Sequence, residues 1–125
     1  MHLIKKNREK LRRAAVLTAK QSIKTINQTT GFLFDTEVKV RIHAGGICGS
    51  DLHYFHHYRM GDFPVREPFI LGHEAAGIVE EIGPNANNIA VGDKVAINPS
   101  HSCGNCEYCL KERELLCNDM SFLGS

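Results

Sequence analysis

The sequence lacks the features that mark several large classes of protein. No apolar run approaches the roughly eighteen residues of a membrane-spanning helix, so no membrane partner is expected. No Gly-x-Gly-x-x-Gly follows a predicted strand, which excludes a dinucleotide site of that kind within these 125 residues. Internal repeats and low-complexity segments are also absent. The apolar content of 42% and charged content of 23% instead indicate one ordinary globular domain.

Charge of neither sign dominates the whole chain, but it is unevenly distributed. The formal net charge is +1. Residues 1–13 carry six Lys or Arg against one Glu, whereas the rest of the chain is mildly acidic. We interpret residues 1–13 as a solvated basic tail, because they lack the serines of a transit peptide and the aromatics of a nucleic-acid-binding face. The acidic body argues against a nucleic-acid partner.

Residue patterns along the chain predict a mainly β fold of short strands joined by glycine turns. Residues 14–18 and 22–27 suit an opening hairpin, and residues 75–82 and 91–97 suit two later strands. Residues 37–42 alternate charged and apolar side chains, so we expect Val38, Val40 and Ile42 to face the core. Residues 54–63 mix aromatics and histidines with a glycine, which favours a pocket-lining loop over a plain surface loop or a regular element.

Four of the five cysteines lie in one short stretch, as Cys103, Cys106, Cys109 and Cys117. A Cys-x-x-Cys step turns tightly enough for two thiolates to reach one ion, and Gly104 suits that turn. Two such steps and a fourth thiolate match the closed tetrahedral shell of structural zinc. An iron–sulfur cluster is the main chemical alternative, although the gap before the last cysteine differs from the bacterial ferredoxin run. Disulfides or free thiols are further alternatives, and no secretory signal supports disulfides.

A second group of ligand-type residues lies earlier in the chain. Cys48 and His73 both stand beside glycines where a strand gives way to a loop, and Glu74 follows His73 directly. A thiolate, an imidazole and a carboxylate suit an open zinc site that keeps a position for water or substrate. The alternative is that Cys48 is a small buried residue and His73 a hydrogen-bonded histidine without a ligand role.

Three stretches together resemble the medium-chain dehydrogenases, the zinc alcohol dehydrogenase superfamily. Residues 72–86 (GHEAAGIVEEIGPNA) match its zinc signature, and residues 46–53 (GICGSDLH) match the segment that supplies its first catalytic-zinc ligand. The spacing of the four clustered cysteines is that of its structural zinc lobe. The resemblance covers residues 14–125 and implies an N-terminal GroES-like catalytic domain. The implied fold is mainly β, a partly open and incomplete GroES-like β-barrel with an irregular zinc lobe held by four cysteines.

The resemblance is strongest to the polyol branch, which contains the idonate and sorbitol dehydrogenases. It rests on short strings, among them the tyrosine after His53 and residues 97–100 and 120–125 around the cysteine stretch. It implies zinc-dependent oxidation of a secondary alcohol in a small polyol, with hydride passed to NAD or NADP. It also implies a cytoplasmic enzyme that forms a homo-oligomer at full length.

The resemblance carries metal-binding roles to individual residues. Cys48 and His73 would bind a catalytic zinc, and Glu74 would lie beside it, through a water or as an alternating ligand. Asp51 would stand behind His73 and accept a hydrogen bond from its other ring nitrogen, which fixes the tautomer. The structural zinc would belong to the cysteine lobe.

Four further residues receive roles in proton transfer or substrate binding. Ser50 would take the substrate proton and pass it, through the cofactor ribose, to His53 at the rim. Tyr54 and Phe122 would line the substrate pocket, although ordinary loop packing explains them equally well.

Members of this superfamily continue beyond the segment seen here. They add a third catalytic-zinc ligand, a Rossmann domain with its glycine fingerprint, and a return to the first barrel. We therefore expect a fragment that is inactive alone, with NAD or NADP bound only by the full-length enzyme. A hypothesis from a different class is a zinc-structured binding module whose basic tail contacts an acidic partner.

Overall fold

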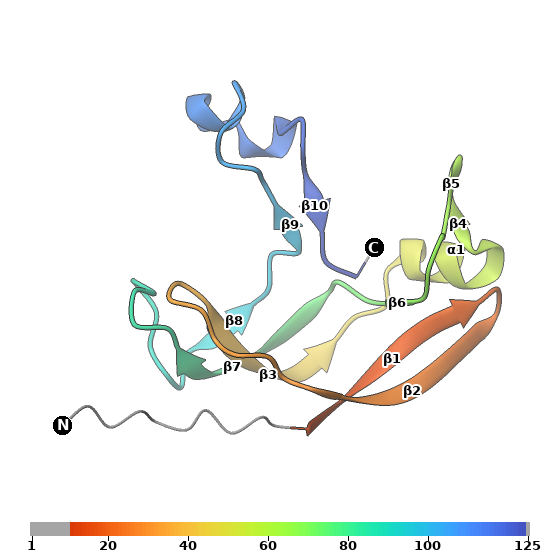
Figure 1. The fold of residues 1–125 in the computed structure, drawn as a ribbon, viewed down its shortest axis with the longest axis horizontal. Coiled ribbons are helices and arrows are strands. Elements are labelled where there is room, and N and C mark those ends of the chain that lie inside the picture. Colours follow the sequence, from red (N-terminus) through yellow and green to blue (C-terminus); the bar gives the residue numbers. More distant parts are fainter. Residues whose placement is uncertain (1–10, 125) are drawn as a thin grey trace.

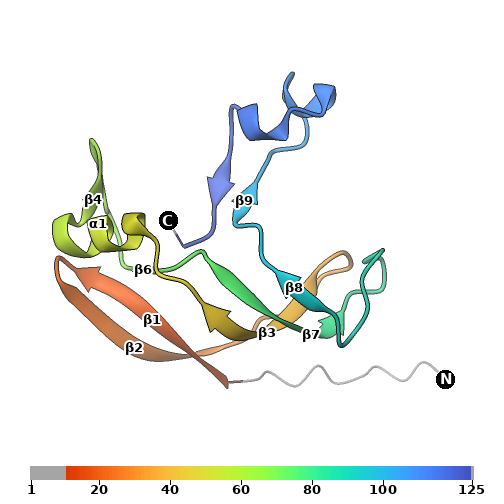
Figure 2. The same ribbon diagram turned by 180° about the vertical axis from the view of Figure 1, so that it is seen from behind.

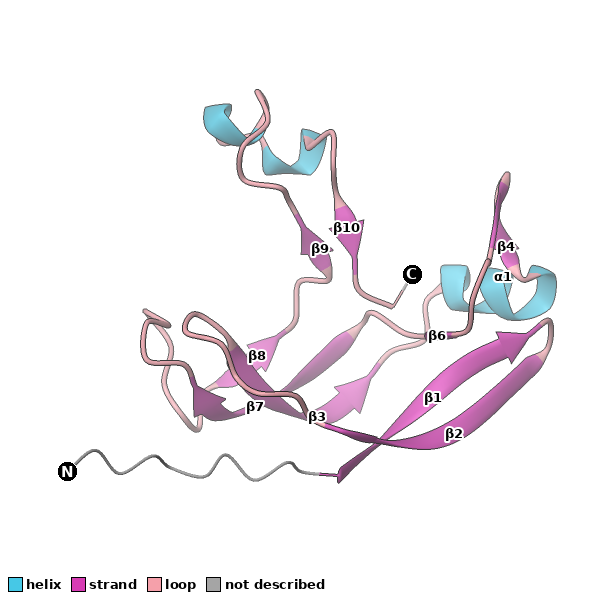
Figure 3. Cartoon of the chain, viewed as in Figure 1, coloured by secondary structure: helices cyan, strands magenta, loops and turns pink. Residues whose placement is uncertain are grey.

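The computed structural model describes residues 11–124 as a mainly β fold (Figure 1). Its elements are β1 (Leu11–Ala19), β2 (Ser22–Thr29), β3 (Val38–Gly45), α1 (Gly49–His57), β4 (Arg59–Met60), β5 (Phe63–Pro64), β6 (Phe69–Ile70), β7 (Ala75–Ile82), β8 (Lys94–Ala96), β9 (Ser100–His101), the 3₁₀ turns η1 (Cys109–Lys111) and η2 (Glu114–Leu116), and β10 (Ser121–Phe122). One sheet has the order β2-β1-β6 and another β3-β7-β8, with two-stranded ribbons β4-β5 and β9-β10 (Figure 3). The described strands close no barrel, which confirms the predicted open fold.

The predicted opening hairpin extends further than the sequence pattern indicated. β1 pairs antiparallel with β2 from Leu11 opposite Thr29 to Ala19 opposite Ser22. Residues 11–13 therefore belong to a strand rather than to the predicted tail. Backbone pairing orders them although their side chains are exposed. The rest of that tail, residues 1–10, lies outside the described residues.

The second sheet contains one prediction that was right and one that was wrong. β7 spans the whole of the strand predicted at residues 75–82. Val38 and Val40 of β3 are half-buried as expected, but Ile42 is 51% exposed rather than facing the core. The register against β7 shifts between Ile42 and Ala44, and no described strand pairs with the other edge of β3. The alternating pattern predicts which face of the strand carries Ile42. It does not predict whether another element covers that face.

The loop predicted at residues 54–63 was wrong for its first part, because α1 continues to His57. The Asp51 carboxylate accepts a hydrogen bond from the Cys48 backbone N–H at 2.8 Å, which satisfies a donor at the helix start. At the other end Tyr58 adopts a left-handed conformation with φ of 55°, and its N–H donates to the Tyr54 carbonyl at 2.8 Å. Capping at both ends thus stabilises a helix of only nine residues.

Few side chains of this chain are fully buried. The buried apolar side chains in the described region are Ala14, Val16, Leu17 and Val79, of which the first three belong to β1. Large apolar side chains such as Phe32, Phe34, Phe63 and Leu115 remain exposed. No helix in residues 11–124 has the length and apolar character to cross a membrane.

The cysteine stretch stands apart from both sheets. Figures 1 and 2 show residues 102–120 projecting on the β9-β10 ribbon, in which Ser121 pairs with His101 and Phe122 with Ser100. Beyond β10 the chain returns toward the segment between β6 and β7, where the Gly72 N–H donates to the Gly124 carbonyl at 3.2 Å. We call residues 102–120 the cysteine lobe.

Candidate metal centres

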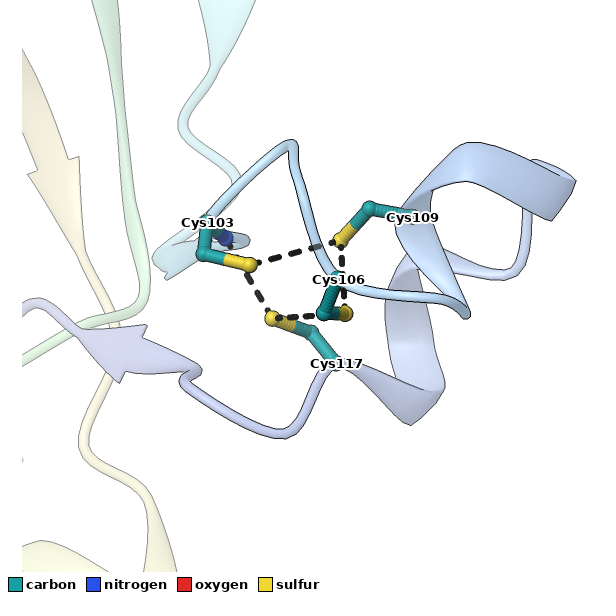
Figure 4. A group of neighbouring side chains, drawn as sticks. All are labelled: Cys103, Cys106, Cys109 and Cys117. Atoms are coloured by element: carbon teal, nitrogen blue, oxygen red, sulfur yellow. Dashed lines mark hydrogen bonds between the residues drawn. The ribbon is translucent and has the colours of Figure 1, made fainter.

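Short-range turns fold the cysteine lobe around its four sulfurs. Gly104 has φ of 73°, a left-handed conformation that glycine adopts without strain, and it turns the chain between Cys103 and Cys106. The Leu110 N–H donates to the Cys106 carbonyl at 3.0 Å, which starts the turn of η1. Figure 4 shows the four sulfurs converging on one point, with Cys117 contributed by the loop directly after η2.

The sulfur positions match the edges of a zinc tetrahedron. The Cys106 sulfur lies 3.5 Å from that of Cys109 and 4.0 Å from that of Cys117, and the Cys103 and Cys109 sulfurs are 3.9 Å apart. Four sulfurs bound to zinc at about 2.3 Å are separated by about 3.8 Å. All five cysteines of the chain are free thiols rather than disulfides. The geometry therefore fits a closed four-thiolate zinc site.

The protonation of these thiols also points to a cation. Backbone N–H groups of Cys109 and Asn118 lower the pKa of Cys106 to about 6. The backbone N–H of Cys103, 3.3 Å from the Cys117 sulfur, lowers the pKa of Cys117. Burial, and then hydrogen bonding with Cys106, raise the pKa of Cys109 to about 12. Cys106 thus favours the thiolate form beside a Cys109 thiol that holds its proton, and a divalent cation at the centre would favour the thiolate form of both.

Cys48, His73 and Glu74 form a second cluster, with one ligand atom from each lying within 4.8 Å of the others. Cys48 is the residue before the first turn of α1, and the other two lie between β6 and β7. A Cβ at Gly46 would overlap the Glu74 carboxylate, so the glycine is what permits this close approach. The Gly46 N–H donates to the Glu74 carbonyl at 2.7 Å. Three ligands of these types make an open site rather than a closed one.

Asp51 lies directly behind His73 and is 5% exposed. Its Oδ1 is 3.6 Å from His73 Nδ1, and neither of these buried atoms has a hydrogen-bond partner among the described residues. An Nδ1–H directed at Asp51 leaves Nε2 as the ligand nitrogen, which is how metal-binding histidines are usually held. A buried Oδ1 and a buried Nδ1 that face each other without other partners fit an ion on the far side of the ring.

Cys48 and His73 shift each other's pKa in opposite directions. Hydrogen bonds from the side chain and backbone of Ser50, and then from His73, lower the pKa of Cys48. Hydrogen bonding with Cys48 raises the pKa of His73, burial opposes this, and the charge of Asp51 adds to it. Cys48 is thereby predisposed to the thiolate form that coordinates metals.

The two residues predicted to relay a proton are placed differently. Ser50 lies at the cluster, where it hydrogen bonds with Cys48. His53 is exposed on α1, and its ring centre is 4.7 Å from that of His57. Within residues 11–124 no hydrogen bond joins Ser50 to His53. A proton passing from one to the other therefore needs a bridging group.

Tyr54 and Phe122, the residues predicted to line a substrate pocket, border one hollow of about 520 Å³. The Tyr54 ring meets Phe69, another wall residue, edge-on with centres 5.3 Å apart. The Phe122 ring centre is 5.5 Å from that of His73. Through Phe122 the hollow therefore adjoins the second cluster.

A comparison with known families identifies the domain. Residues 35–125, well over half of the chain, match the family described as the alcohol dehydrogenase GroES-like domain. The chain belongs to this family.

Individual relatives place the GroES-like domain within longer enzymes. L-idonate 5-dehydrogenase of Vitis vinifera is 48% identical over 89 residues, which cover 71% of this chain and 24% of the relative. Sorbitol dehydrogenase of Bacillus subtilis (strain 168) is 42% identical over 113 residues, which cover 90% of this chain and 32% of the relative. The crystal structure of L-idonate 5-dehydrogenase from Escherichia coli matches with a TM-score of 0.82 at 39% identity. The match covers 90% of this chain and 32% of that protein. The chain spans between a quarter and a third of the length of these proteins.

The GroES-like domain also contains site residues that motif reasoning missed. Gly124 has φ of 71°, and a Cβ there would overlap the backbone of Gly72, so this glycine lets the segment after β10 cross beside His73. Phe63 and Phe69 share the wall of the hollow. No local pattern marks these residues, because their proximity depends on contacts between segments some fifty residues apart.

Proposed function

We propose that this GroES-like domain is the N-terminal catalytic part of a zinc-dependent polyol dehydrogenase. The reaction would oxidise a secondary alcohol of a small polyol to a ketone, passing hydride to NAD or NADP and releasing one proton. The observation that carries the proposal is the pairing of buried Asp51 Oδ1 with His73 Nδ1 beside Cys48. The relatives named L-idonate 5-dehydrogenase and sorbitol dehydrogenase support a polyol as substrate.

The proposal assigns one ion to each cluster. The four clustered cysteines would hold a structural zinc, and Cys48 and His73 would hold a catalytic one. A catalytic zinc supplies Lewis acidity, which lowers the pKa of a substrate hydroxyl. Glu74 is exposed and would bind beside Cys48 and His73, directly or through water. Asp51 would hold the His73 ring in its productive tautomer and orientation.

The remaining residues would move the proton and position the substrate. The Ser50 hydroxyl, next to Cys48, would take the substrate proton, and exposed His53 would release it to solvent. The missing hydrogen bond between Ser50 and His53 fits a route through the cofactor ribose. Tyr54 and Phe122 would exclude water from the substrate's carbon chain, since both border the hollow beside His73.

Cofactor binding would lie outside this chain in the proposed enzyme. The 125 residues contain no glycine fingerprint for a dinucleotide, and the chain covers only part of its relatives. We therefore propose that residues 14–125 act only within a longer protein. By the same resemblance we propose a cytoplasmic homo-oligomer without nucleic-acid or membrane partners.

A chimera tests the proposal. This chain would replace the matching third of the Bacillus subtilis sorbitol dehydrogenase, and sorbitol and L-idonate would be assayed with NAD and NADP. We expect polyol-dependent reduction of the nucleotide and two zinc ions per chain. Cys48→Ala should abolish turnover and remove one zinc, because it deletes a ligand of the open site alone. A chimera that keeps both zinc ions but turns over no polyol would contradict the proposal.

A further inference from the structure

Three histidines on α1 form a group that the proposed site uses only in part. His53, His56 and His57 are all exposed on α1, the last two of them in its final turn. His53 and His57 are four residues apart and therefore lie on one face. Their ring centres are 4.7 Å apart. His56 lies off this face, with its ring edge-on to Phe55 at 5.2 Å and 6.4 Å from the ring centre of His57.

The separation of the His53 and His57 rings is that of two imidazoles sharing one metal ion. With a metal–nitrogen bond of about 2.0–2.1 Å, the ion lies about 3.2 Å from the ring centre. Two rings at a right angle around the ion are then about 4.5 Å apart, and two at the tetrahedral angle about 5.2 Å. The observed 4.7 Å falls between these values. The 6.4 Å between His56 and His57 exceeds both.

We propose that His53 and His57 form a two-histidine site for a divalent transition-metal ion on the exposed face of α1. Imidazole nitrogens suit Zn²⁺, Ni²⁺ and Cu²⁺, with Cu²⁺ bound most tightly, and waters would complete the coordination. The helix backbone places both side chains on one face before the ion arrives, which lowers the conformational entropy cost of binding. The site shares no residue with the cysteine lobe or with the Cys48, His73 and Glu74 cluster.

An ion at this site would block the proton release proposed for His53. This consequence rests on the proposed function. A ring nitrogen of His53 that binds a metal ion can no longer accept a proton. Free zinc or nickel beyond the two resident ions would therefore inhibit polyol oxidation by closing the proton exit. His57 has no role in the proposed chemistry, so substitutions there should leave the basal activity unchanged.

Calorimetric titration of the zinc-loaded chain with Ni²⁺ at neutral pH tests the site directly. The loaded clusters offer no free thiolates, so the exposed histidines are the ligands left. We expect His57→Gln to weaken nickel binding at least about tenfold, because the second ligand acts intramolecularly. His53→Gln should weaken it equally, and the double variant should lose nothing more. His56→Gln is the matched control and should bind like the parent chain.

Two results would overturn the proposal. Equal weakening by His56→Gln and His57→Gln would show that nickel binds the histidines without distinction, and undiminished binding by His57→Gln would exclude the pair. His57→Cys supplies another metal ligand opposite His53 and should restore binding, which separates ligand loss from damage to the helix. Nickel binding is measured without substrate. A chain that fails to bind nickel at His53 and His57 therefore leaves the dehydrogenase proposal unaffected. An inactive chimera likewise leaves this site standing.

Discussion

At the scale of single residues, Asp51 joins the local fold to the candidate chemistry. Its Oδ2 accepts the Cys48 N–H at the start of α1, and its Oδ1 faces His73 Nδ1 at 3.6 Å. The buried Asp51 carboxylate thus holds the backbone of Cys48 and the ring of His73, and both residues are proposed zinc ligands. The sequence position three residues after Cys48 serves both tasks.

Asp51→Asn tests the second of these tasks. The amide keeps an oxygen for the Cys48 N–H but loses the charge that orients and polarises His73. We expect zinc bound by Cys48, His73 and Glu74 to weaken about 10–100-fold, the usual cost of losing such a partner. Zinc per chain after dialysis against graded chelator measures this. The ion of the cysteine lobe should be retained in the same samples, and equal retention of both ions would contradict the role of Asp51.

Asp51→Asn should also change the pKa of His73 in the metal-free chain. The pKa of His73 is raised, so the folded state holds this proton more tightly than the unfolded state does. The resulting stabilisation is complete below the ordinary histidine pKa of about 6.5 and is lost as pH rises through the folded-state value. Asp51→Asn should lower the His73 pKa, as followed by NMR of its ring protons. An unchanged midpoint would show that Asp51 exerts no charge effect on the ring.

At the scale of elements, α1 shows how far sequence reasoning reaches. The strand at residues 75–82 follows from its own pattern, because alternation and a closing turn are local signals. The helix was missed because its start uses Cys48 and Asp51 where Ser or Thr and Glu are usual, and its aromatic and histidine residues favour no element. The members of both candidate clusters were predicted from motifs, whereas the hollow required the approach of β10 to His73, which no local pattern contains.

The crossing of Gly124 over Gly72 is an element-scale contact that a substitution can test. Gly124→Ala introduces a Cβ that overlaps the Gly72 backbone, so the segment after β10 should move away from His73. The ring-current shift that Phe122 imposes on His73 should disappear from NMR spectra. Gly61→Ala is the matched control, because Gly61 is also left-handed but has open space around it. Both variants carry a strain of about 1–2 kcal/mol, so only Gly124→Ala should remove the shift.

The cysteine lobe should hold zinc without help from the rest of the chain. Its four ligands form a closed shell, and structural zinc sites in peptides bind with about 10–16 kcal/mol. We therefore expect about one tightly bound ion per chain after desalting. Cys106→Ser combined with Cys109→Ser should remove it, as measured by metal analysis, while Cys48→Ala should not. An ion that survives the double substitution would belong elsewhere.

At the scale of the whole molecule, the described residues leave large apolar side chains and strand edges exposed. Ile42 on β3, Phe32 and Phe34 before it, and Leu115 on the lobe are all more than half exposed. β2, β3 and β8 each leave one edge unpaired among the described strands. Exposed apolar side chains beside open strand edges favour association with further protein.

The isolated chain should therefore associate and show no dehydrogenase activity. Light scattering should detect concentration-dependent oligomers, since unpaired edges and apolar faces become covered by other copies. The zinc-loaded chain should not reduce NAD or NADP with sorbitol or L-idonate, because its sequence contains no glycine fingerprint to hold the dinucleotide, and attack geometry is worth about 7–11 kcal/mol. Turnover above a Cys48→Ala control would contradict this, as would a strictly monomeric chain.

The attachment of the cysteine lobe by β9 and β10 links metal binding in the lobe to the structure beside His73. The ribbon rests on two residue pairs, Ser121 with His101 and Phe122 with Ser100. Closing a loop of this length costs chain entropy that so short a ribbon offsets poorly, whereas zinc binding in the lobe offsets it easily. Phe122, within the ribbon, and Gly124, just beyond it, contact His73 and Gly72. We therefore expect metal binding in the lobe to stabilise the closed ribbon and, with it, the wall beside His73.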